Sequence, residues 1–282
     1  MTEPFVWNVD PVMLRLGSIE VRYYGICFGL ALVTGFLVWR ARVLRFGETP
    51  AFSEQMLFWG IPAVIIGGRL GHCFFYEPRF YLAHPLRILA FWEGGTASHG
   101  VAIGLAVVLV LFSRRNRITW TRLSDYFAPA VALAVGWVRV GNFFNSEVLG
   151  HSTSVPWAVV FARHDDLPRH PAQLYDLLIG PITWLVLTAI ERRNLRPIGS
   201  GLIAGAFLTV YFGLRIFVEQ YKDFYAEAIR QLAPFSAIEQ WLGVPVHTGQ
   251  WLSVLPVLAG IYLMVRAMSR ADAGIAPRGL QS

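Results

Sequence analysis

A polar cluster follows directly on one of the most apolar stretches of the chain. Residues 127–137 read FAPAVALAVGW, and the next turns bring Arg139, Asn142, Asn145 and Glu147. Phosphate oxygens accept hydrogen bonds readily from arginine, from side-chain amides and from backbone N–H groups that are not committed to a helix. The stretch therefore predicts an anion site, with a polar helix end at a membrane interface as the plainer alternative.

The spacing of these residues indicates that their helix ends within the cluster. Arg139 and Asn142 are three residues apart and share one helical face, whereas Asn145 and Glu147 would point elsewhere on a continuous helix. Gly150 and two earlier glycines permit the backbone to unwind here. Irregular backbone at membrane depth is tolerated only where it lines a cavity or is buried in protein. We therefore expect an unwound segment at the site.

A second arginine lies in another apolar segment, on a stripe of polar side chains. Tyr211, Arg215, Glu219 and Lys222 follow one another at i, i+4, i+8 and i+11, which places them on one face of a helix. One interpretation is an ion pair between Arg215 and Glu219 that merely neutralises itself. Apolar residues can often replace a buried ion pair without loss of stability, so the presence of this pair favours a use in binding.

Arg69 and His99 are two further candidates, and each has a structural alternative. Arg69 follows two glycines that predict close helix packing, so its guanidinium either donates to carbonyls of a neighbouring helix or contacts a substrate. His99 stands between Ser98 and Gly100 at the start of the third apolar segment. A histidine there is either an amphipathic anchor or a general base, since imidazole titrates near neutral pH.

The composition of the chain indicates that these charged residues lie in a membrane protein. The chain has 282 residues, of which 55% are hydrophobic and 15% charged, and its mean hydropathy is +0.49. Soluble domains carry roughly 25% charged residues. We expect an all-α integral membrane protein, a single polytopic domain over residues 1–282, with loop elements at 145–170 and 222–247. Spanning helices need about 20 apolar residues, and seven segments approach this: 23–39, 56–76, 95–112, 123–144, 171–190, 201–221 and 248–268.

The basic residues orient these segments. Thirteen of the 24 follow the first, third, fifth and seventh segments, and eight lie on the other side. Because positive residues gather in the cytoplasm, we expect the N-terminus outside and the C-terminus inside. The remaining three are Arg69, Arg139 and Arg215, which fall within segments, where a central charge costs roughly 2.5–3.5 kcal/mol. The net charge of +6 follows from this bias, and nucleic-acid binding is not expected.

The blocks that carry these residues resemble the prolipoprotein diacylglyceryl transferase family of bacterial inner membranes. The resemblance runs in family order over nearly the whole chain. Its most specific block is Arg-x-Gly-Asn-Phe-x-Asn-x-Glu-x-x-Gly, which begins at Arg139. The other matching blocks are Tyr23–Gly25, Gly67–Gly71, Glu93–Gly100, Arg169–Tyr175 and Tyr211–Glu219.

The resemblance implies a transferase of the bacterial inner membrane with its active site toward the periplasm. The implied reaction moves the diacylglyceryl group of phosphatidylglycerol to the lipobox cysteine of a preprolipoprotein, forming a thioether and releasing glycerol phosphate. The implied partners are phosphatidylglycerol, signal peptides with a lipobox, and the surrounding membrane lipids. Because arginines can hold the phosphate without a cation, we expect no metal and no other cofactor.

For this reaction His99, Arg139 and Arg215 are the expected catalytic residues. His99 is the candidate general base, because a free cysteine thiol with a pKa of about 8.5 is mostly protonated at neutral pH. The two arginines are expected to bracket the phosphate and stabilise its developing charge. The expected substrate-binding residues are Asn142, Asn145, Glu147, Gly150, Tyr24, Tyr211, Glu219 and Arg69.

Four positions depart from the family pattern. Arg22 stands for a common histidine, Val101 and Val138 for glycines, and Lys222 for a frequent arginine. None has a role assigned above, so they leave substrate tolerance and level of activity open. The alternative from another class is a lipid or anion transporter or flippase, because intramembrane arginines and glycine-broken helices also suit an anion pathway.

Overall fold

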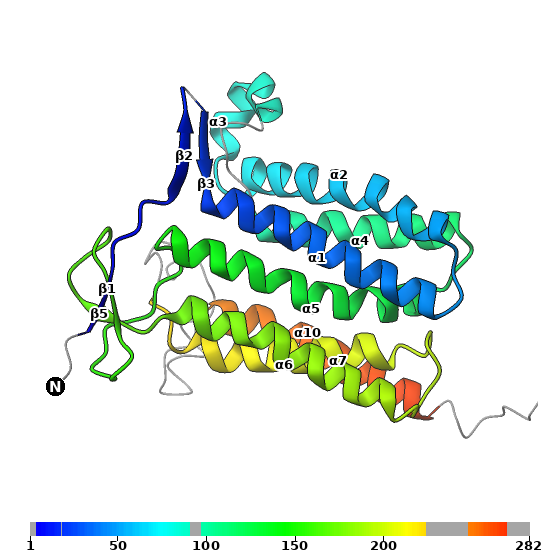
Figure 1. Cartoon of the computed structure of the whole chain (residues 1–282). Coiled ribbons are helices and arrows are strands. Elements are labelled where there is room, and N and C mark those ends of the chain that lie inside the picture. The colour runs from blue at the N-terminus through cyan, green and yellow to red at the C-terminus, as the bar shows by residue number, and fades with distance from the viewer. Residues whose placement is uncertain (1–3, 18, 91–96, 224–247, 270–282) are drawn as a thin grey trace, which may run out of the picture.

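The protein is a bundle of long helices that run side by side (Figure 1). The computed structural model describes residues 4–17, 19–90, 97–223 and 248–269, apart from the side chains of residues 19, 98, 99 and 248. The expected all-α membrane architecture is confirmed, because six of these helices, all but α4, are long and apolar enough to cross a membrane. The long helices are α1 (Tyr23–Arg45), α2 (Pro50–Phe75), α4 (Ser98–Arg115), α5 (Trp120–Phe144), α6 (Ala172–Arg192), α7 (Leu202–Glu219) and α10 (Thr248–Ser269).

Each expected segment corresponds to one of these helices, but several helices extend beyond the apolar run. Helix α1 continues through Arg40 and Arg42 to Arg45, because long basic side chains can follow an apolar surface and still reach water. Helix α2 begins at Pro50, and the Thr49 hydroxyl caps it by accepting a hydrogen bond from the Phe52 N–H at 3.1 Å. Hydropathy marks the buried part of a helix, whereas caps mark its end.

Glycine contacts set the spacing between α2 and α4. A Cβ atom placed on Gly71 of α2 would lie 2.6 Å from the Cα of Gly100 in α4, and one placed on Gly104 would collide with the Ala63 carbonyl. Gly67 and Gly71, like Gly100 and Gly104, are four residues apart, which is the small-residue spacing of closely packed membrane helices. The close helix packing expected from the glycines before Arg69 is confirmed.

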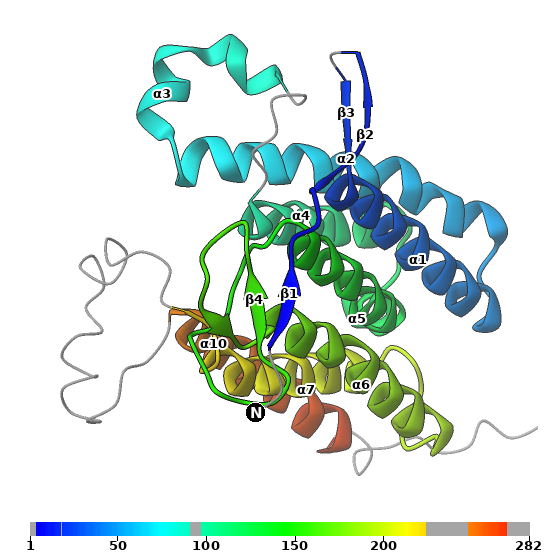
Figure 2. The ribbon, with the colours of Figure 1, turned by 60° about the vertical axis from the view of Figure 1, so that its left-hand side comes forward.

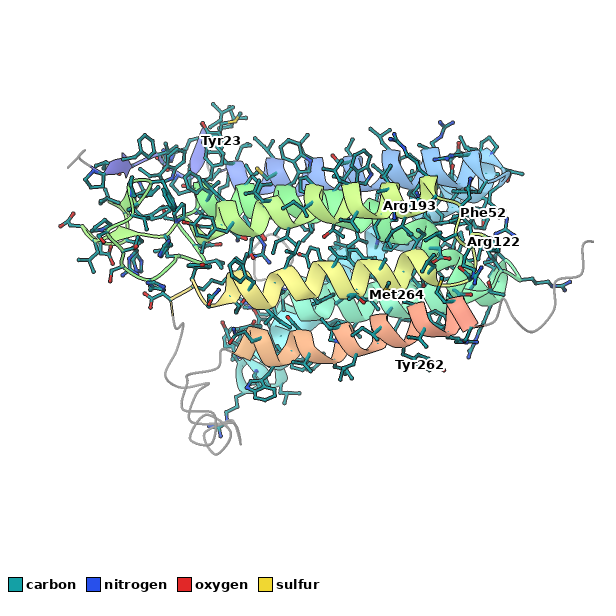
Figure 3. All side chains as sticks on the ribbon, turned by 90° about the horizontal axis from the view of Figure 1, so that it is seen from below. Tyr23, Phe52, Arg122, Arg193, Tyr262 and Met264 are labelled. Carbon is teal, nitrogen blue, oxygen red and sulfur yellow. The ribbon has the colours of Figure 1, made fainter. Side chains whose placement is uncertain are left out.

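The arginine-rich end of the bundle is held by ion pairs between helices. Figure 3 shows Arg122 and Arg193 at this end, opposite Tyr23. Arg42 of α1 donates to Glu191 of α6 at 2.6 Å, and Arg45 contacts the other oxygen of the same carboxylate at 2.8 Å. The two halves of the chain are therefore joined here by charge as well as by apolar packing.

Asp125 of α5 caps the start of α7 at the same end. Its fully buried carboxylate accepts hydrogen bonds from the N–H groups of Gly199, Gly201 and Ala204 at 2.8, 3.0 and 2.9 Å. The first N–H groups of a helix have no partner within the helix, and Ala204 is the third residue of α7, whereas Gly199 and Gly201 precede it. A carboxylate that binds both the preceding segment and the first turn of α7 fixes where the helix begins.

Asp125→Ala is expected to lower the free energy of unfolding by about 3 kcal/mol, because three N–H groups, two of them buried, lose their acceptor. Circular dichroism during thermal unfolding in detergent measures the change. Asp125→Asn is the matched control, and it should lose less because one acceptor oxygen remains. An alanine variant as stable as the parent would show that the carboxylate is not the cap.

The other end of the bundle carries short elements that the sequence did not predict individually (Figure 2). Strand β1 pairs in parallel with β4, which pairs in antiparallel fashion with β5, and β2 and β3 form a separate hairpin. Of the expected loop element 222–247, only residues 222 and 223 lie within the described residues. The short elements are β1 (Phe5–Trp7), β2 (Val12–Leu16), β3 (Ile19–Arg22), α3 (Pro78–Ala83), η1 (Pro85–Leu89), β4 (Val159–Phe161) and β5 (Pro168–Arg169).

Candidate active site

Close packing of α5 on α6 brings together the first pair of site residues. A Cβ atom on Gly180 of α6 would collide with the Ala132 carbonyl of α5, and one on Gly136 would lie 3.1 Å from Leu177. One helical turn from these contacts, toward the strand-bearing end, stand Arg139 on α5 and Asp176 on α6. The glycines therefore let two charged side chains meet between the helices.

Arg139 is held from two sides. Its Nε atom lies 3.3 Å from Oδ2 of Asp176, and its Nη1 atom donates to Oδ1 of Asn142 at 3.3 Å. The Asn142 amide donates in turn to one Glu147 oxygen, and the Asn145 amide donates to the other, each at 3.2 Å. All four residues of the predicted anion cluster are thus joined in one set of contacts.

The residues of the α7 stripe join the same set of contacts through Asp176. The Lys222 Nζ atom lies 2.9 Å from Asp176 Oδ2 and 2.8 Å from Glu219 Oε2, and that Glu219 oxygen lies 3.8 Å from Arg215. Tyr211, the first residue of the stripe, lies near Arg139. We call this set the polar network; it contains Arg139, Asn142, Asn145, Glu147, Asp176, Arg215, Glu219 and Lys222.

The charges of the polar network balance. It contains three cations and three carboxylates. Asp176 and Lys222 are buried, with side chains only 2% and 6% exposed, whereas Glu147 is exposed and the other three are partly buried. Arg215 is the most open of the ion-paired members, at 27%, and has the longest ion-pair distance. An added anion therefore meets Arg215 with the least rearrangement.

The segment after α5 is irregular, as the sequence predicted. The helix ends at Phe144, and Ser146 and Val148 both have φ values in the left-handed region, at 53° and 57°. This conformation is costly for a β-branched residue such as Val148, so the surrounding contacts must impose it. Gln173 of α6 supplies one of them by donating to the Glu147 carbonyl at 2.6 Å.

Gly150 follows this turn, at a position where only a residue without a side chain fits. Its N–H donates to the His170 carbonyl at 3.1 Å, and a Cβ atom here would lie 2.8 Å from the Tyr221 carbonyl. The next residue, His151, donates its N–H to the Tyr221 carbonyl at 3.1 Å. The structure thus gives Gly150 a packing role beside the polar network, and its predicted substrate contact stays a prediction.

Arg169 clamps the loop that follows. Its guanidinium donates to Asp165 of the same loop, to the Gly150 carbonyl at 3.0 Å and to Asp223 beyond α7 at 2.6 Å. Hydrogen bonding to Arg169 lowers the pKa of Asp165 below its usual value. The clamp ties the loop between α5 and α6 to the end of α7, next to Lys222.

His170 gives the stability of this end a pH dependence. Burial, and then the neighbouring His151, lower the pKa of His170 from its usual 6.5. The unfolded chain therefore takes up this proton at a higher pH than the folded chain, so the free energy of unfolding falls as pH drops below 6.5. Thermal unfolding across this range should show a shallower pH dependence for His170→Gln than for the parent. An unchanged slope would contradict the assignment.

Two of the predicted site residues, Tyr24 and His99, need separate description. Tyr24 packs against the α5 helix at Gly141 and lies near Glu147 and Arg139, so it borders the polar network. The backbone of His99 lies in the first turn of α4, which begins at Ser98, but the His99 side chain is not among those that the structure describes. Its predicted role as general base therefore stays a prediction.

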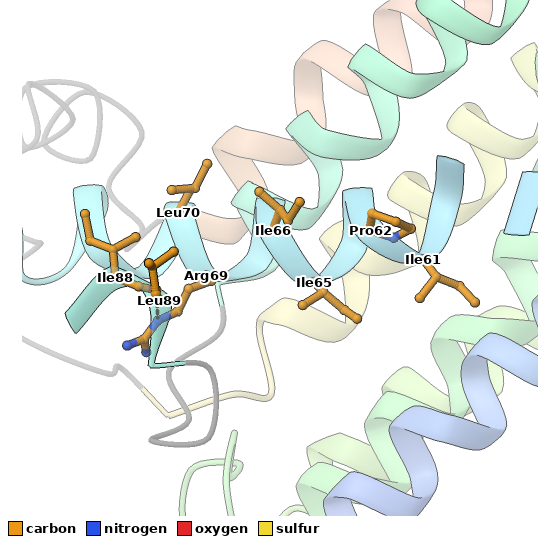
Figure 4. A pocket seen from close by; sticks show the side chains of 8 residues that line it. All are labelled: Ile61, Pro62, Ile65, Ile66, Arg69, Leu70, Ile88 and Leu89. Atoms are coloured by element: carbon orange, nitrogen blue, oxygen red, sulfur yellow. Dashed lines mark hydrogen bonds between the residues drawn. The ribbon is translucent and has the colours of Figure 1, made fainter. Parts of the chain in front are cut away.

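Arg69 is engaged elsewhere. Its buried guanidinium donates to the carbonyls of Ile88 and Arg87 in η1, at 3.1 and 2.7 Å, and lies over the Tyr81 ring. Figure 4 shows it at one end of an apolar groove of about 510 Å³ that is lined by α2 and η1, whereas the polar network is built from α5, α6 and α7. These contacts match the structural alternative for Arg69, and its predicted substrate contact stays untested.

Asp176 and the role of Lys222 were missed by sequence reasoning. Acidic residues within spans are as costly as arginines, so the same search applied to carboxylates would have singled out Asp176. It stands in an apolar run, three residues after Gln173 and seven after Arg169. Lys222 was recognised as a member of a helical stripe and as a departure from the family pattern, but not as a partner of Asp176, and α7 ends at Glu219 before reaching it.

Comparison with known proteins identifies the family. A family model described as prolipoprotein diacylglyceryl transferase matches residues 11–266. The phosphatidylglycerol–prolipoprotein diacylglyceryl transferase of Nitrosospira multiformis is 36% identical over 275 residues, which cover 96% of this chain and 91% of the relative. The protein of the same name from Tolumonas auensis is 38% identical over 262 residues, covering 92% and 96%. The chain belongs to the prolipoprotein diacylglyceryl transferase family.

Proposed function

We propose that the protein transfers the diacylglyceryl group of phosphatidylglycerol to the lipobox cysteine of a preprolipoprotein. The observation that carries the proposal is the polar network, which joins Arg139 and Arg215 at one end of the bundle. Family membership supplies the substrate class, and the arginines supply a means of holding its phosphate. Membership also favours transfer over the transporter alternative.

The phosphate site is proposed to centre on Arg215 and Arg139. Glu219 lies 3.8 Å from Arg215 but 2.8 Å from Lys222, so the nearer cation neutralises it and Arg215 can turn to a substrate. Within the described residues, Asn145 Oδ1 and Ser146 Oγ have no hydrogen-bond partner, which leaves capacity for a glycerol headgroup beside them. Donors fixed in advance in an apolar site stabilise developing phosphate charge strongly.

The transfer step is a substitution at the glyceryl carbon that carries the phosphate. The cysteine Sγ forms a bond to that carbon, the carbon–oxygen bond breaks, and its electron pair leaves on glycerol phosphate. His99 is proposed to accept the thiol proton, because the thiolate is the nucleophile. Arg139 and Arg215 are proposed to stabilise the leaving phosphate, with Asn142 holding the Arg139 guanidinium in place.

The proposed location is the bacterial inner membrane, with the active site toward the periplasm. Thirteen basic residues follow alternate predicted spans, and several of them, including Arg42, Arg122 and Arg193, lie at the end of the bundle opposite Tyr23. Positive residues favour the cytoplasmic side, which leaves the polar network facing outward. Exported cysteines arrive on that face.

A mass measurement tests the proposal. Purified protein in vesicles of phosphatidylglycerol and phosphatidylcholine is incubated with a lipobox peptide, and the peptide is expected to gain the mass of one diacylglyceryl group on its cysteine. Vesicles of phosphatidylcholine alone, and a peptide with serine in place of cysteine, should give no product. His99→Ala should lower the rate by about 10²–10⁴-fold if His99 is the base. Lipid crossing the bilayer without a covalent product would instead support the transporter.

A further inference from the structure

Asp176 is the carboxylate on which the polar network depends. Its Oδ2 atom lies between two cations, 3.3 Å from Arg139 Nε and 2.9 Å from Lys222 Nζ. The side chain is 2% exposed and projects from the second turn of α6, between α5 and the segment that follows α7. Within the described residues neither of its oxygens completes a well-aligned hydrogen bond, so its contacts are ion pairs rather than a saturated hydrogen-bond network.

Stability alone does not account for such a residue. Removing a carboxylate from water is costly, and apolar side chains of similar volume often replace a buried ion pair with no loss of stability or with a gain. A carboxylate with unfilled acceptor capacity is a still poorer choice for stability. The position therefore favours a use for the charge.

The geometry points to orientation of Arg139. Asp176 holds the guanidinium at Nε, on the side next to the side-chain stem, while Asn142 holds Nη1 at 3.3 Å. Two fixed partners on one planar group set the direction of its remaining N–H donors. We propose that Asp176 is a positioning residue that fixes Arg139 for the phosphate of the lipid substrate; this rests on the proposed function.

A simpler role must be separated from this one. Asp176 also lies beside Lys222, which is 6% exposed and would be a poorly compensated buried cation without it, although Glu219 lies 2.8 Å away. If neutralising Lys222 were the whole role of Asp176, a variant that lacks both residues would have the kcat of a variant that lacks Lys222 alone. If Asp176 positions Arg139, the kcat of the double variant would be lower than that of the Lys222 variant.

Asp176→Asn separates charge from position. The network gains one positive charge, so phosphatidylglycerol should bind roughly threefold more tightly and its KM should fall. The Arg139 guanidinium loses its ionic partner, and a displaced catalytic group can cost about 10²-fold in kcat. General damage to the site would weaken binding and raise KM. A variant in which KM and kcat both fall is therefore not a generally damaged one. Asp176→Glu keeps the charge and should recover part of kcat.

The double variant Asp176→Leu/Lys222→Met is the decisive comparison. It removes one charge of each sign, so the net charge of the polar network is that of the parent. The protein with this apolar pair should unfold at the temperature of the parent or above it. We expect its KM to return to the parent value while its kcat is about 10²-fold below that of Lys222→Met, the matched single variant. A double variant with the kcat of Lys222→Met would overturn the proposal and leave Asp176 as the counter-ion of Lys222 alone.

Measuring phosphatidylglycerol binding in the absence of the peptide separates the test of the positioning role from the test of the proposed function. If the parent itself gives no lipidated peptide, the proposed function fails. Native mass spectrometry of phosphatidylglycerol bound to the parent, to Asp176→Asn and to the double variant then carries the test. Binding that is unchanged or weaker in Asp176→Asn would overturn the positioning role. A fold check by size-exclusion chromatography in detergent accompanies each variant.

Discussion

Arg139→Ala is expected to lower lipid transfer by about 10³-fold, mainly in kcat, because it removes the most enclosed phosphate donor of the site. The chain should still fold, since Asp176 keeps Lys222 at 2.9 Å as a counter-ion after the arginine is gone. Rates of transfer to a lipobox peptide, measured at several concentrations of phosphatidylglycerol, give kcat and KM separately.

Arg139→Lys is the matched control for charge. Lysine keeps the positive charge but lacks the planar group that contacts Asp176 through Nε and Asn142 through Nη1 together. It should therefore recover only a small part of the loss. If Arg139→Ala transferred lipid at the parent rate while Arg215→Ala did not, Arg139 would be a structural partner of Asp176 and the phosphate site would centre on Arg215.

Gly100→Ala is expected to destabilise the protein by about 3 kcal/mol or more, because the added methyl group has no space between α2 and α4. It would collide with the Gly67 carbonyl and lie 2.7 Å from the Cα of Gly71, and both obstacles are backbone. The helices must separate, which also displaces the neighbouring His99. Thermal unfolding in detergent and transfer activity should both fall.

Gly29→Ala is the matched control, since Gly29 lies on the exposed face of α1 and a Cβ atom there meets nothing within 4 Å. Alanine is the better helix former, so this variant should be as stable as the parent or more stable by about 0.5–1 kcal/mol. Equal losses at the two glycines would refute the close-packing explanation.

The helices could be predicted because the signal for each is local. An apolar run predicts a span wherever it occurs, and the expected segment at 171–190 became α6, Ala172–Arg192. The cluster after Arg139 could be predicted for the same reason, since Asn142 lies one turn away and Glu147 follows the helix end. Residues one turn apart in a helix share a face of that helix, independently of the contacts it makes with other segments.

The remaining features depend on contacts between distant segments. The pairing of β1 with β4 joins residues near Trp7 to residues near Phe161, and neither three-residue strand is long enough to show a pattern alone. The carbonyl partners of Arg69 come from a short helix whose path the sequence does not reveal. Asp176 is recognisable as unusual, but only the packing of α5 on α6 shows which arginine it meets.

The charge balance of the polar network also bears on how the protein is made. Arg139 is synthesised before Asp176, so α5 enters the bilayer with a cation whose partner has yet to emerge from the ribosome. An unpartnered charge raises the cost of insertion, by roughly 2.5–3.5 kcal/mol at a helix centre. Helices α5 and α6 should therefore partition as a hairpin rather than singly. Lys222 follows α7, so the ion pairs close only when that later helix has been inserted.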